Sequence, residues 1–188
     1  MTRVAPGDAL TFNVARLLAE PSGSVRTYQV DGVKVEPGDG LRLSAPVDGQ
    51  LRLTRTNRGL LVEGECTTTL AEECSRCLRP IEIPLELRLE EEALPLIDIP
   101  TGLRLDPSTE PEVARLTDHH ELELEPLIAD AVALAAPIAP LCREACPGLC
   151  VVCGLELATG PHDHPDDEID PRLAVLRGFP VDATGEND

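Results

Sequence analysis

The sequence LLVEGECTTTLAEECSRCLRPIEIPLELRLEEEAL, residues 60–94, contains two runs of alternating apolar and polar residues on either side of a Cys-x2-Cys pair. Alternation with a period of two is typical of β-strands that bury one face. We therefore predict strands over residues 60–70 and from Ile81 onward, with Cys74 and Cys77 at the turn between them. Pro84 lies inside the second run and cannot donate a backbone hydrogen bond, which predicts an edge strand or a bulge there.

Similar alternation precedes this stretch in four shorter runs. The sequence TNRG at 56–59 lies just before residue 60, and its glycine suits a hairpin turn between two strands. Together the runs predict an antiparallel, curved β-sheet. The four runs are TFNV at 11–14, SVRTYQV at 24–30, GLRLSA at 40–45 and QLRLTRT at 50–56.

The spacing of apolar residues becomes near-helical after position 120. Glutamates crowd the front of this segment, where the helix dipole favours negative charge, and Pro137 and Pro140 follow it. We predict one helix over roughly residues 125–136, packed against the sheet. Residues 95–112 are rich in Pro, Asp, Thr and Gly and are predicted to form a loop. The apolar positions with helical spacing are Leu122, Leu124, Leu127, Ile128, Ala131, Val132 and Ala135.

These elements predict an α+β fold with a Cys-rich, zinc-binding segment near its C-terminal end. The chain has 188 residues, enough for one well-filled domain. We place a single α+β domain, including the cysteine cluster at 142–153, over residues 1–160. Residues 161–188 are acidic and proline-rich, which predicts a partly disordered tail. Within that tail we expect the segment DPRLAVL, residues 170–176, to dock on the domain.

The charge of the chain is strongly negative and unevenly distributed. The formal net charge is −18, but residues 1–60 hold 8 Lys and Arg against 6 Asp and Glu. The N-terminal third is therefore the region that repels a phosphate backbone least. No segment resembles a signal peptide or the roughly 20 apolar residues of a membrane span. We accordingly expect a cytoplasmic protein whose cysteines are reduced.

Two Cys-x2-Cys pairs, Cys74/Cys77 and Cys150/Cys153, predict metal binding. A two-residue gap presents both thiolates to one ion, and zinc takes four donors in a tetrahedron. We predict one zinc on Cys74, Cys77 and the i, i+4 pair Cys142/Cys146, which one helical turn would aim the same way. A second zinc would be held by Cys150, Cys153, His162 and His164.

Other interpretations of the same residues remain open. Cys142, Cys146, Cys150 and Cys153 would also make one compact site, leaving Cys74 and Cys77 free or redox-active. We expect Cys66 to be a buried free thiol, and His119 and His120 to lie on the surface. The glutamates at 90–92 are expected to form a solvated strand end. Because Cys-dominated zinc sites are usually closed and structural, we predict no enzymatic activity.

The motifs CSRCLRP at 74–80, PLCREACPGLCVVCG at 140–154 and DPRLAVL at 170–176 together resemble the YceD family, a group of large ribosomal RNA subunit accumulation proteins. The likeness covers most of the chain, and the elements follow one another in the family's order. After Cys153 the chain departs from the family's G-x-N-L-N and Cys-x-Cys pattern, and offers His162 and His164 instead. The resemblance implies a role in accumulation of large-subunit (23S) rRNA without known catalytic activity.

Arginines suggest how such a protein would meet its partner. Side chains at alternating positions of a sheet and its turns are suited to RNA phosphates. The acidic middle of the chain suggests an alternative, an adaptor that binds a basic ribosomal protein without touching RNA. A further alternative is that the arginines only pair with the surplus carboxylates. The candidate RNA-binding residues are Arg52, Arg55, Arg58, Arg76 and Arg79, with Arg42 nearby.

Overall fold

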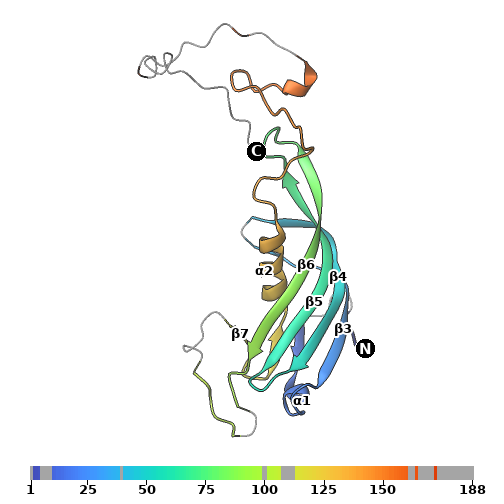
Figure 1. The fold of residues 1–188 in the computed structure, drawn as a ribbon, viewed down its shortest axis with the longest axis vertical. Helices are drawn as coiled ribbons and strands as arrows, with labels where there is room; N and C mark the ends of the chain where they lie inside the picture. The colour runs from blue at the N-terminus through green and yellow to red at the C-terminus, as the bar shows by residue number, and fades with distance from the viewer. Residues whose placement is uncertain are drawn as a thin grey trace, which may run out of the picture.

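A six-stranded sheet in the order β1-β3-β4-β5-β6-β7 forms the body of the molecule (Figure 1). The computed structural model describes residues 2–4, 10–38, 40–98, 101–106, 113–160, 164 and 172. The strands of this sheet are β1 (Thr2–Val4), β3 (Val25–Val33), β4 (Arg42–Arg55), β5 (Leu60–Glu73), β6 (Pro80–Leu94) and β7 (Ala114–Arg115).

A second, two-stranded sheet and short helices complete the described part of the chain. The small sheet pairs β2 (Thr11–Asn13) with β8 (Glu121–Glu123) in antiparallel register. The helices are α1 (Ala15–Leu18), α2 (Glu125–Ala135) and the 3-10 turn η2 (Leu157–Thr159). The predicted α+β fold with a curved sheet is confirmed, and α2 begins and ends within a residue of the predicted helix.

The sheet is mixed at its edges, whereas the sequence predicted an antiparallel sheet throughout. The four long strands β3 to β6 are antiparallel neighbours, but β1 runs parallel to β3 and β7 runs parallel to β6. The run at 11–14 does form a strand, but it pairs with β8 outside the main sheet. Strands of two or three residues show no measurable alternation, so the sequence gives no basis for assigning their partners.

The long strands arise from the alternating runs. The predicted strands at 40–45 and 50–56 are one continuous strand, β4, because register shifts between Leu43 and Asp48 interrupt the alternation without breaking the pairing. Residues 56–59 make the predicted hairpin turn between β4 and β5. Pro84 lies opposite Thr69 in an unshifted ladder, and β7 covers β6 only at its end. Pro84 therefore lies on an edge strand without a bulge.

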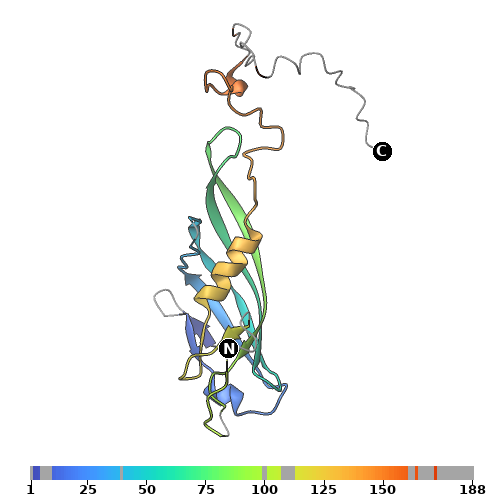
Figure 2. The same cartoon turned by 90° about the vertical axis from the view of Figure 1, so that its left-hand side faces the viewer.

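Helix α2 packs against one face of the sheet, on the β6 side (Figure 2). Its buried residues Leu127, Ile128, Ala131 and Val132 meet the inward side chains of the long strands. Gly64 has room only for hydrogen on this face, since a Cβ there would lie 2.4 Å from Cδ2 of Leu51. Among the described residues, no helix lies on the opposite face of the long strands (Figure 1). The sheet therefore has a core side and an outer side.

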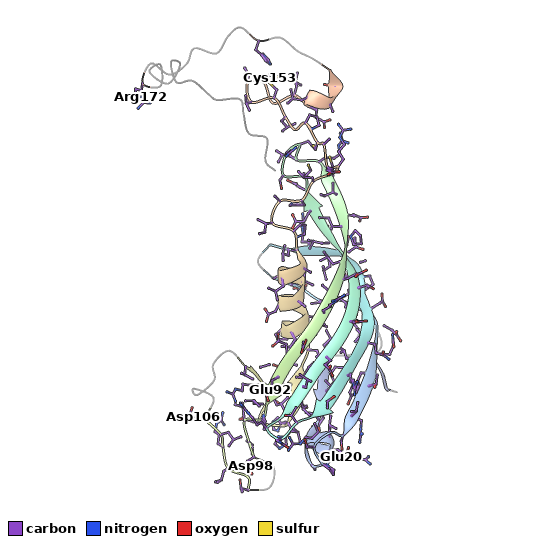
Figure 3. All side chains as sticks on the ribbon, in the orientation of Figure 1. Glu20, Glu92, Asp98, Asp106, Cys153 and Arg172 are labelled. Atoms are coloured by element: carbon purple, nitrogen blue, oxygen red, sulfur yellow. The ribbon has the colours of Figure 1, made fainter. Side chains whose placement is uncertain are left out.

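The β5–β6 hairpin extends to one end of an elongated molecule, and the chain after α2 runs along to the same end (Figure 1). Figure 3 shows Cys153 at this end, opposite Glu20, Glu92 and Asp98. The predicted tail over residues 161–188 lies outside the described residues except at positions 164 and 172. Its partial disorder and the docking of residues 170–176 therefore stay predictions.

Candidate metal centre

Four cysteines from two distant parts of the chain meet at the end of the β5–β6 hairpin. The Sγ atoms of Cys74 and Cys146 lie 3.8 Å apart, and those of Cys77 and Cys142 lie 3.7 Å apart. All four Sγ atoms lie within 4.8 Å of one another. A tetrahedron with zinc–sulfur bonds of about 2.3 Å has edges of about 3.8 Å. The four thiols therefore fit the coordination shell of a single zinc ion.

The first pair of thiols is positioned by a tight turn that we call the first knuckle, residues 73–80. Its ends are paired as Glu73 and Pro80, the last rung of the β5–β6 ladder. The Cys74 N–H donates to the Arg79 carbonyl over 2.8 Å, and the Leu78 N–H donates to the Cys74 carbonyl over 2.9 Å. Leu78 has a φ of 57°, in the left-handed region. This turn points both thiols of the pair to the same side.

The second pair of thiols is held by hydrogen bonds between the first knuckle and the segment after α2. The Ser75 N–H donates to the Pro140 carbonyl over 2.8 Å, and Nη1 of Arg76 donates to the Cys146 carbonyl over 2.9 Å. The predicted helical turn at Cys142 and Cys146 is wrong, because residues 142–146 form bends and a turn instead. Their sulfurs converge through the path of the backbone and do not share a helix face.

The electrostatics of the cluster favour a bound cation. Backbone N–H groups of Cys142 and Cys77 donate to the Cys74 sulfur and lower the pKa of that thiol to about 6. Burial raises the pKa of the Cys142 thiol to about 12, and hydrogen bonds with neighbouring thiols add to the rise. Cys74 therefore loses its proton more readily than Cys142. The Cys142 thiol needs a cation to share its charge before it ionises near neutral pH.

A second group of donors lies farther out, on Cys150, Cys153 and His164. Their ligand atoms lie within 4.8 Å of one another, and Cys150 Sγ is 3.2 Å from His164 Nε2. Cys150 is 9% exposed, whereas Cys153 is exposed. His162, predicted as a further donor, lies outside the described residues. The structure thus groups the six cysteines as four and two, and places Cys142 and Cys146 with Cys74 and Cys77.

Two residues that the sequence analysis did not select support this end of the molecule. Gly148 is buried with a φ of 82°, and a Cβ there would lie 3.1 Å from the Arg76 carbonyl oxygen. Glu156 accepts a hydrogen bond from Nη2 of Arg79 over 2.8 Å. Pro147 before Gly148 signals a turn, but nothing in the local sequence links Glu156 with Arg79, which lies 77 positions earlier.

The cysteine and histidines predicted to lie outside the metal sites have different environments. Cys66 is 2% exposed in β5, as expected, and burial raises the pKa of its thiol to about 11. His119 is exposed, as expected. His120 is only half-buried, has a φ of 57°, and keeps a buried Nδ1 without a partner among the described residues. It turns the chain into β8 instead of standing free on the surface.

The candidate RNA-binding arginines have protein partners. Nε of Arg55 donates to the Leu18 carbonyl over 2.9 Å, and its Nη1 donates to the carbonyls of Thr56 and Gly59. Ion pairs within 4.0 Å join Arg52 with Glu63, Arg58 with Glu92, and Arg79 with Glu156. Arg55 and Arg76 thus bind backbone carbonyls, whereas Arg52, Arg58 and Arg79 would each have to give up an ion pair to bind another anion.

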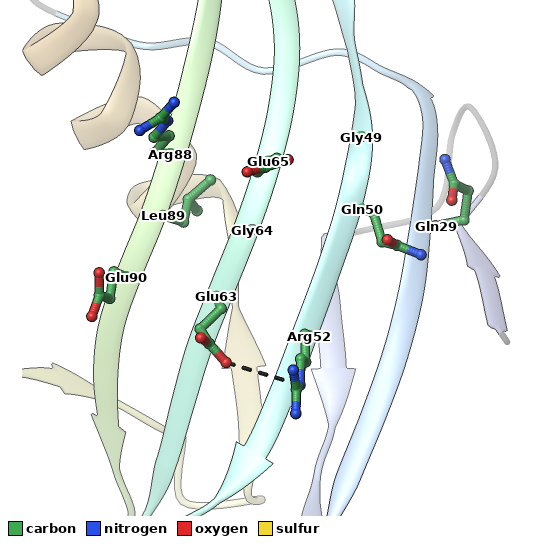
Figure 4. Close-up of a pocket in the computed structure, with 10 residues that line it drawn as sticks. All are labelled: Gln29, Gly49, Gln50, Arg52, Glu63, Gly64, Glu65, Arg88, Leu89 and Glu90. Carbon is green, nitrogen blue, oxygen red and sulfur yellow. Dashed lines mark ion pairs between the residues drawn. The ribbon is translucent and has the colours of Figure 1, made fainter.

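The outer side of the sheet is predominantly acidic where it forms a shallow hollow (Figure 4). Cross-strand register places Gln29, Gln50, Glu65 and Arg88 in one row. The adjacent rows contribute Thr27, Arg52, Glu63 and Glu90, and Asp48, Thr67 and Glu86. Five carboxylates thus face two guanidinium groups on this surface. The predicted solvated strand end at 90–92 is exposed at Glu90 and Glu91, while Glu92 is half-buried.

The fold and its cysteines define a class: a strand-rich α+β protein whose long hairpin ends in thiol groups that can hold a metal ion. The chain belongs to the YceD family, whose description is "Large ribosomal RNA subunit accumulation protein YceD" and whose profile matches residues 62–179. The match begins in β5 and includes both groups of metal donors.

Similar proteins are known from mycobacteria. The chain is 36% identical over 172 residues to uncharacterised proteins of Mycobacterium bovis and Mycobacterium tuberculosis, which covers 89% of this chain and 79% of those proteins. It is 35% identical over 147 residues to an uncharacterised protein of Mycobacterium leprae, covering 77% and 65%. No solved structure matches the chain significantly. Among the described residues, no helix has the length and apolar character that crossing a membrane requires.

Proposed function

We propose that this chain promotes the accumulation of large-subunit (23S) rRNA in the cytoplasm as a non-enzymatic binding factor with structural zinc. Membership of the YceD family supports the biological role. The observation that carries the molecular part is the convergence of Cys74 and Cys77 with Cys142 and Cys146. A zinc ion on these four thiolates has a full set of protein ligands, so it fastens the chain after α2 to the hairpin and leaves no position for a substrate.

We further propose that the outer side of the sheet contacts a basic ribosomal protein in preference to RNA. Its carboxylates outnumber its arginines, and a surface of this charge attracts cationic chains and repels phosphates. Arg52 and Arg58 have carboxylate neighbours. Arg55 supports backbone carbonyls and is therefore unsuited to binding phosphate. This charge distribution favours the adaptor over direct rRNA contact through the arginines.

A complementation experiment tests whether the biological role depends on the proposed zinc site. Cells lacking the gene would receive the wild-type chain, the Cys74→Ser/Cys77→Ser variant, or a Cys66→Ala variant as a matched control for loss of a cysteine. We expect wild type and Cys66→Ala to restore the level of 23S rRNA and the knuckle variant to fail. Full restoration by a knuckle variant expressed at wild-type level would remove structural zinc from the proposal.

Binding measurements distinguish the two partners. We expect Glu63→Gln/Glu65→Gln/Glu90→Gln to weaken binding to purified basic large-subunit proteins, with a loss that shrinks at high salt. The comparison variant is Arg52→Ala/Arg58→Ala, which removes positive instead of negative charge and leaves the structural Arg55 unchanged. Weakened binding of 23S rRNA in this arginine variant, together with unchanged protein binding in the glutamine variant, would favour direct RNA contact and contradict the adaptor.

A further inference from the structure

The second Cys-x2-Cys turn, which we call the second knuckle, residues 149–156, repeats the backbone of the first knuckle. Its ends are bridged as Leu149 and Glu156, the same seven-residue offset that joins the ends of the first knuckle. The Cys150 N–H donates to the Leu155 carbonyl over 2.8 Å, and the Gly154 N–H donates to the Cys150 carbonyl over 2.9 Å. Gly154 has a φ of 73°, in the place of Leu78. Two unrelated segments have thus adopted one thiol-presenting turn.

The donors around the second knuckle are suited to zinc. Two thiols and an imidazole are among the commonest zinc ligands, with bonds of about 2.3 Å to sulfur and 2.0–2.1 Å to nitrogen. The 3.2 Å between Cys150 Sγ and His164 Nε2 is shorter than the sum of two such bonds, so both atoms reach one ion. We propose that Cys150, Cys153 and His164 hold a second zinc ion, and that this site forms only after the first site is filled.

The order of filling follows from how the second knuckle is attached. Its Leu149 N–H donates to the Arg76 carbonyl over 3.2 Å, and its Glu156 pairs with Arg79 over 2.8 Å. Gly148 packs against the same Arg76 carbonyl, where a side chain would not fit without strain. Arg76 lies between the two thiols of the first knuckle, and Arg79 follows them. The surface that supports the second knuckle is therefore itself ordered by the first site.

The dependence is one-way because the second knuckle lacks a core of its own. Val151, Val152 and Leu155 are 98%, 49% and 60% exposed, so its apolar residues gain little from burial. A short isolated hairpin is at best marginally stable in water. The first knuckle, in contrast, ends the unbroken β5–β6 ladder. It keeps its turn whether or not the second knuckle is ordered.

The order of filling rests on the proposed first zinc site, whereas the second site rests on its own donors. Zinc content of the purified full-length chain tests both. We expect two zinc ions in wild type and in Cys66→Ala, one in Cys150→Ser/Cys153→Ser, and none in Cys74→Ser/Cys77→Ser. One zinc in wild type, unchanged by Cys150→Ser/Cys153→Ser, would overturn the second site. One zinc retained by Cys74→Ser/Cys77→Ser through the second knuckle would overturn the order.

Zinc transfer to a chromophoric chelator supplies a readout that leaves every ligand in place. We expect two phases in wild type, the fast one from the exposed second site and absent from Cys150→Ser/Cys153→Ser. Gly148→Ala forces a side chain into a left-handed position against the Arg76 carbonyl, so it should accelerate the fast phase about tenfold and leave the slow phase unchanged. Equal acceleration of both phases, or of neither, would contradict the proposed attachment.

These outcomes are distinguishable from failure of the proposed function. A chain that holds two zinc ions in the stated order but whose knuckle variants restore 23S rRNA fully retains the second site and loses the biological role. A chain that restores 23S rRNA in a zinc-dependent way but holds a single ion retains the role and loses the second site.

Discussion

Leu78 shows how a single backbone angle contributes to a candidate metal site. Its φ of 57° places it in the left-handed region, where an L-residue with a Cβ is strained by about 1–2 kcal/mol. The side chain is 58% exposed, so burial offsets little of that strain. The second knuckle has a glycine at the equivalent position, which carries no such strain. The first knuckle therefore adopts this turn despite the backbone strain at Leu78.

Replacing Leu78 with glycine should therefore stabilise the protein. We expect Leu78→Gly to raise the free energy of unfolding by about 0.5–1 kcal/mol, since relief of strain exceeds the entropy that glycine gains in the unfolded chain. Denaturant unfolding of the zinc-loaded protein measures this. Gly154→Ala makes the opposite change at the matching position and should weaken the second knuckle. Destabilisation by Leu78→Gly would mean that contacts of the leucine side chain stabilise the protein by more than the backbone strain destabilises it.

Burial should make Cys66 a poorly reactive thiol. Burial raises the pKa of its thiol from 9.0 to about 11, and alkylating reagents attack the thiolate. Near pH 8 the thiolate fraction is about 100-fold lower than for an unshifted thiol, and it should grow about tenfold per pH unit until the pH approaches 11. Mass-spectrometric mapping after iodoacetamide treatment measures the rate at Cys66. Labelling at the rate of a free thiol at pH 8 would contradict the buried environment.

At the scale of elements, two arginines of β4 that are similar in the sequence have different roles in the structure. Arg55 ends β4 and donates to the carbonyl of Leu18 in α1 and to Gly59 in the hairpin turn. Arg52, on the outer side of the same strand, lies 4.0 Å from Glu63, and both side chains are solvent-exposed. The first arginine joins three elements, whereas the second makes a surface ion pair that contributes little stability.

The two arginines provide a matched pair of substitutions in one strand. We expect Arg55→Ala to lower the free energy of unfolding by about 2–3 kcal/mol, because partly buried carbonyls lose a charged donor. Arg52→Ala should change it by less than about 0.5 kcal/mol. Thermal and denaturant unfolding compare the two variants. Equal effects of the two substitutions would show that Arg55 is not the link between α1 and the hairpin turn.

At the scale of the whole molecule, the hydrophobic core and the thiol groups occupy different regions. The core lies between α2 and the long strands, while both cysteine groups lie beyond it at the end of the β5–β6 hairpin (Figures 1 and 3). Apolar burial stabilises the first region, and under the proposed zinc binding thiolate coordination would stabilise the second. Loss of metal should therefore affect one end of the molecule selectively.

Chelation tests this separation. After zinc removal we expect the Ser75 and Leu149 amides, which bond to Pro140 and Arg76, to lose protection from hydrogen exchange. Amides paired between β4 and β5 should keep theirs, because the core is intact. Loss of protection throughout the sheet would show that the metal supports the whole fold.

The apparent zinc affinity of the protein should rise with pH, since zinc binding displaces protons from the thiols.

The local sequence was sufficient to predict the helix, the turn that carries Cys74 and Cys77, and the long strands apart from the continuity of β4. Alternation and helical spacing report which face of an element is buried, and proline and glycine report where an element ends. The Cys-x2-Cys spacing likewise predicts a metal-competent turn, because two thiols so close in the chain have few other ways to face together. The same motifs also predicted membership of the YceD family, which the family match confirms.

The tertiary structure alone decided which thiols meet, which arginines are structural and how the sheet ends. Cys77 and Cys142 are 65 positions apart, and their 3.7 Å approach depends on the path of the chain along the sheet and past α2. The parallel pairing of β1 and β7 and the second sheet depend on strands too short to carry a period. Such contacts join segments whose separation no local pattern encodes, so they become defined only when the core has set the positions of the elements.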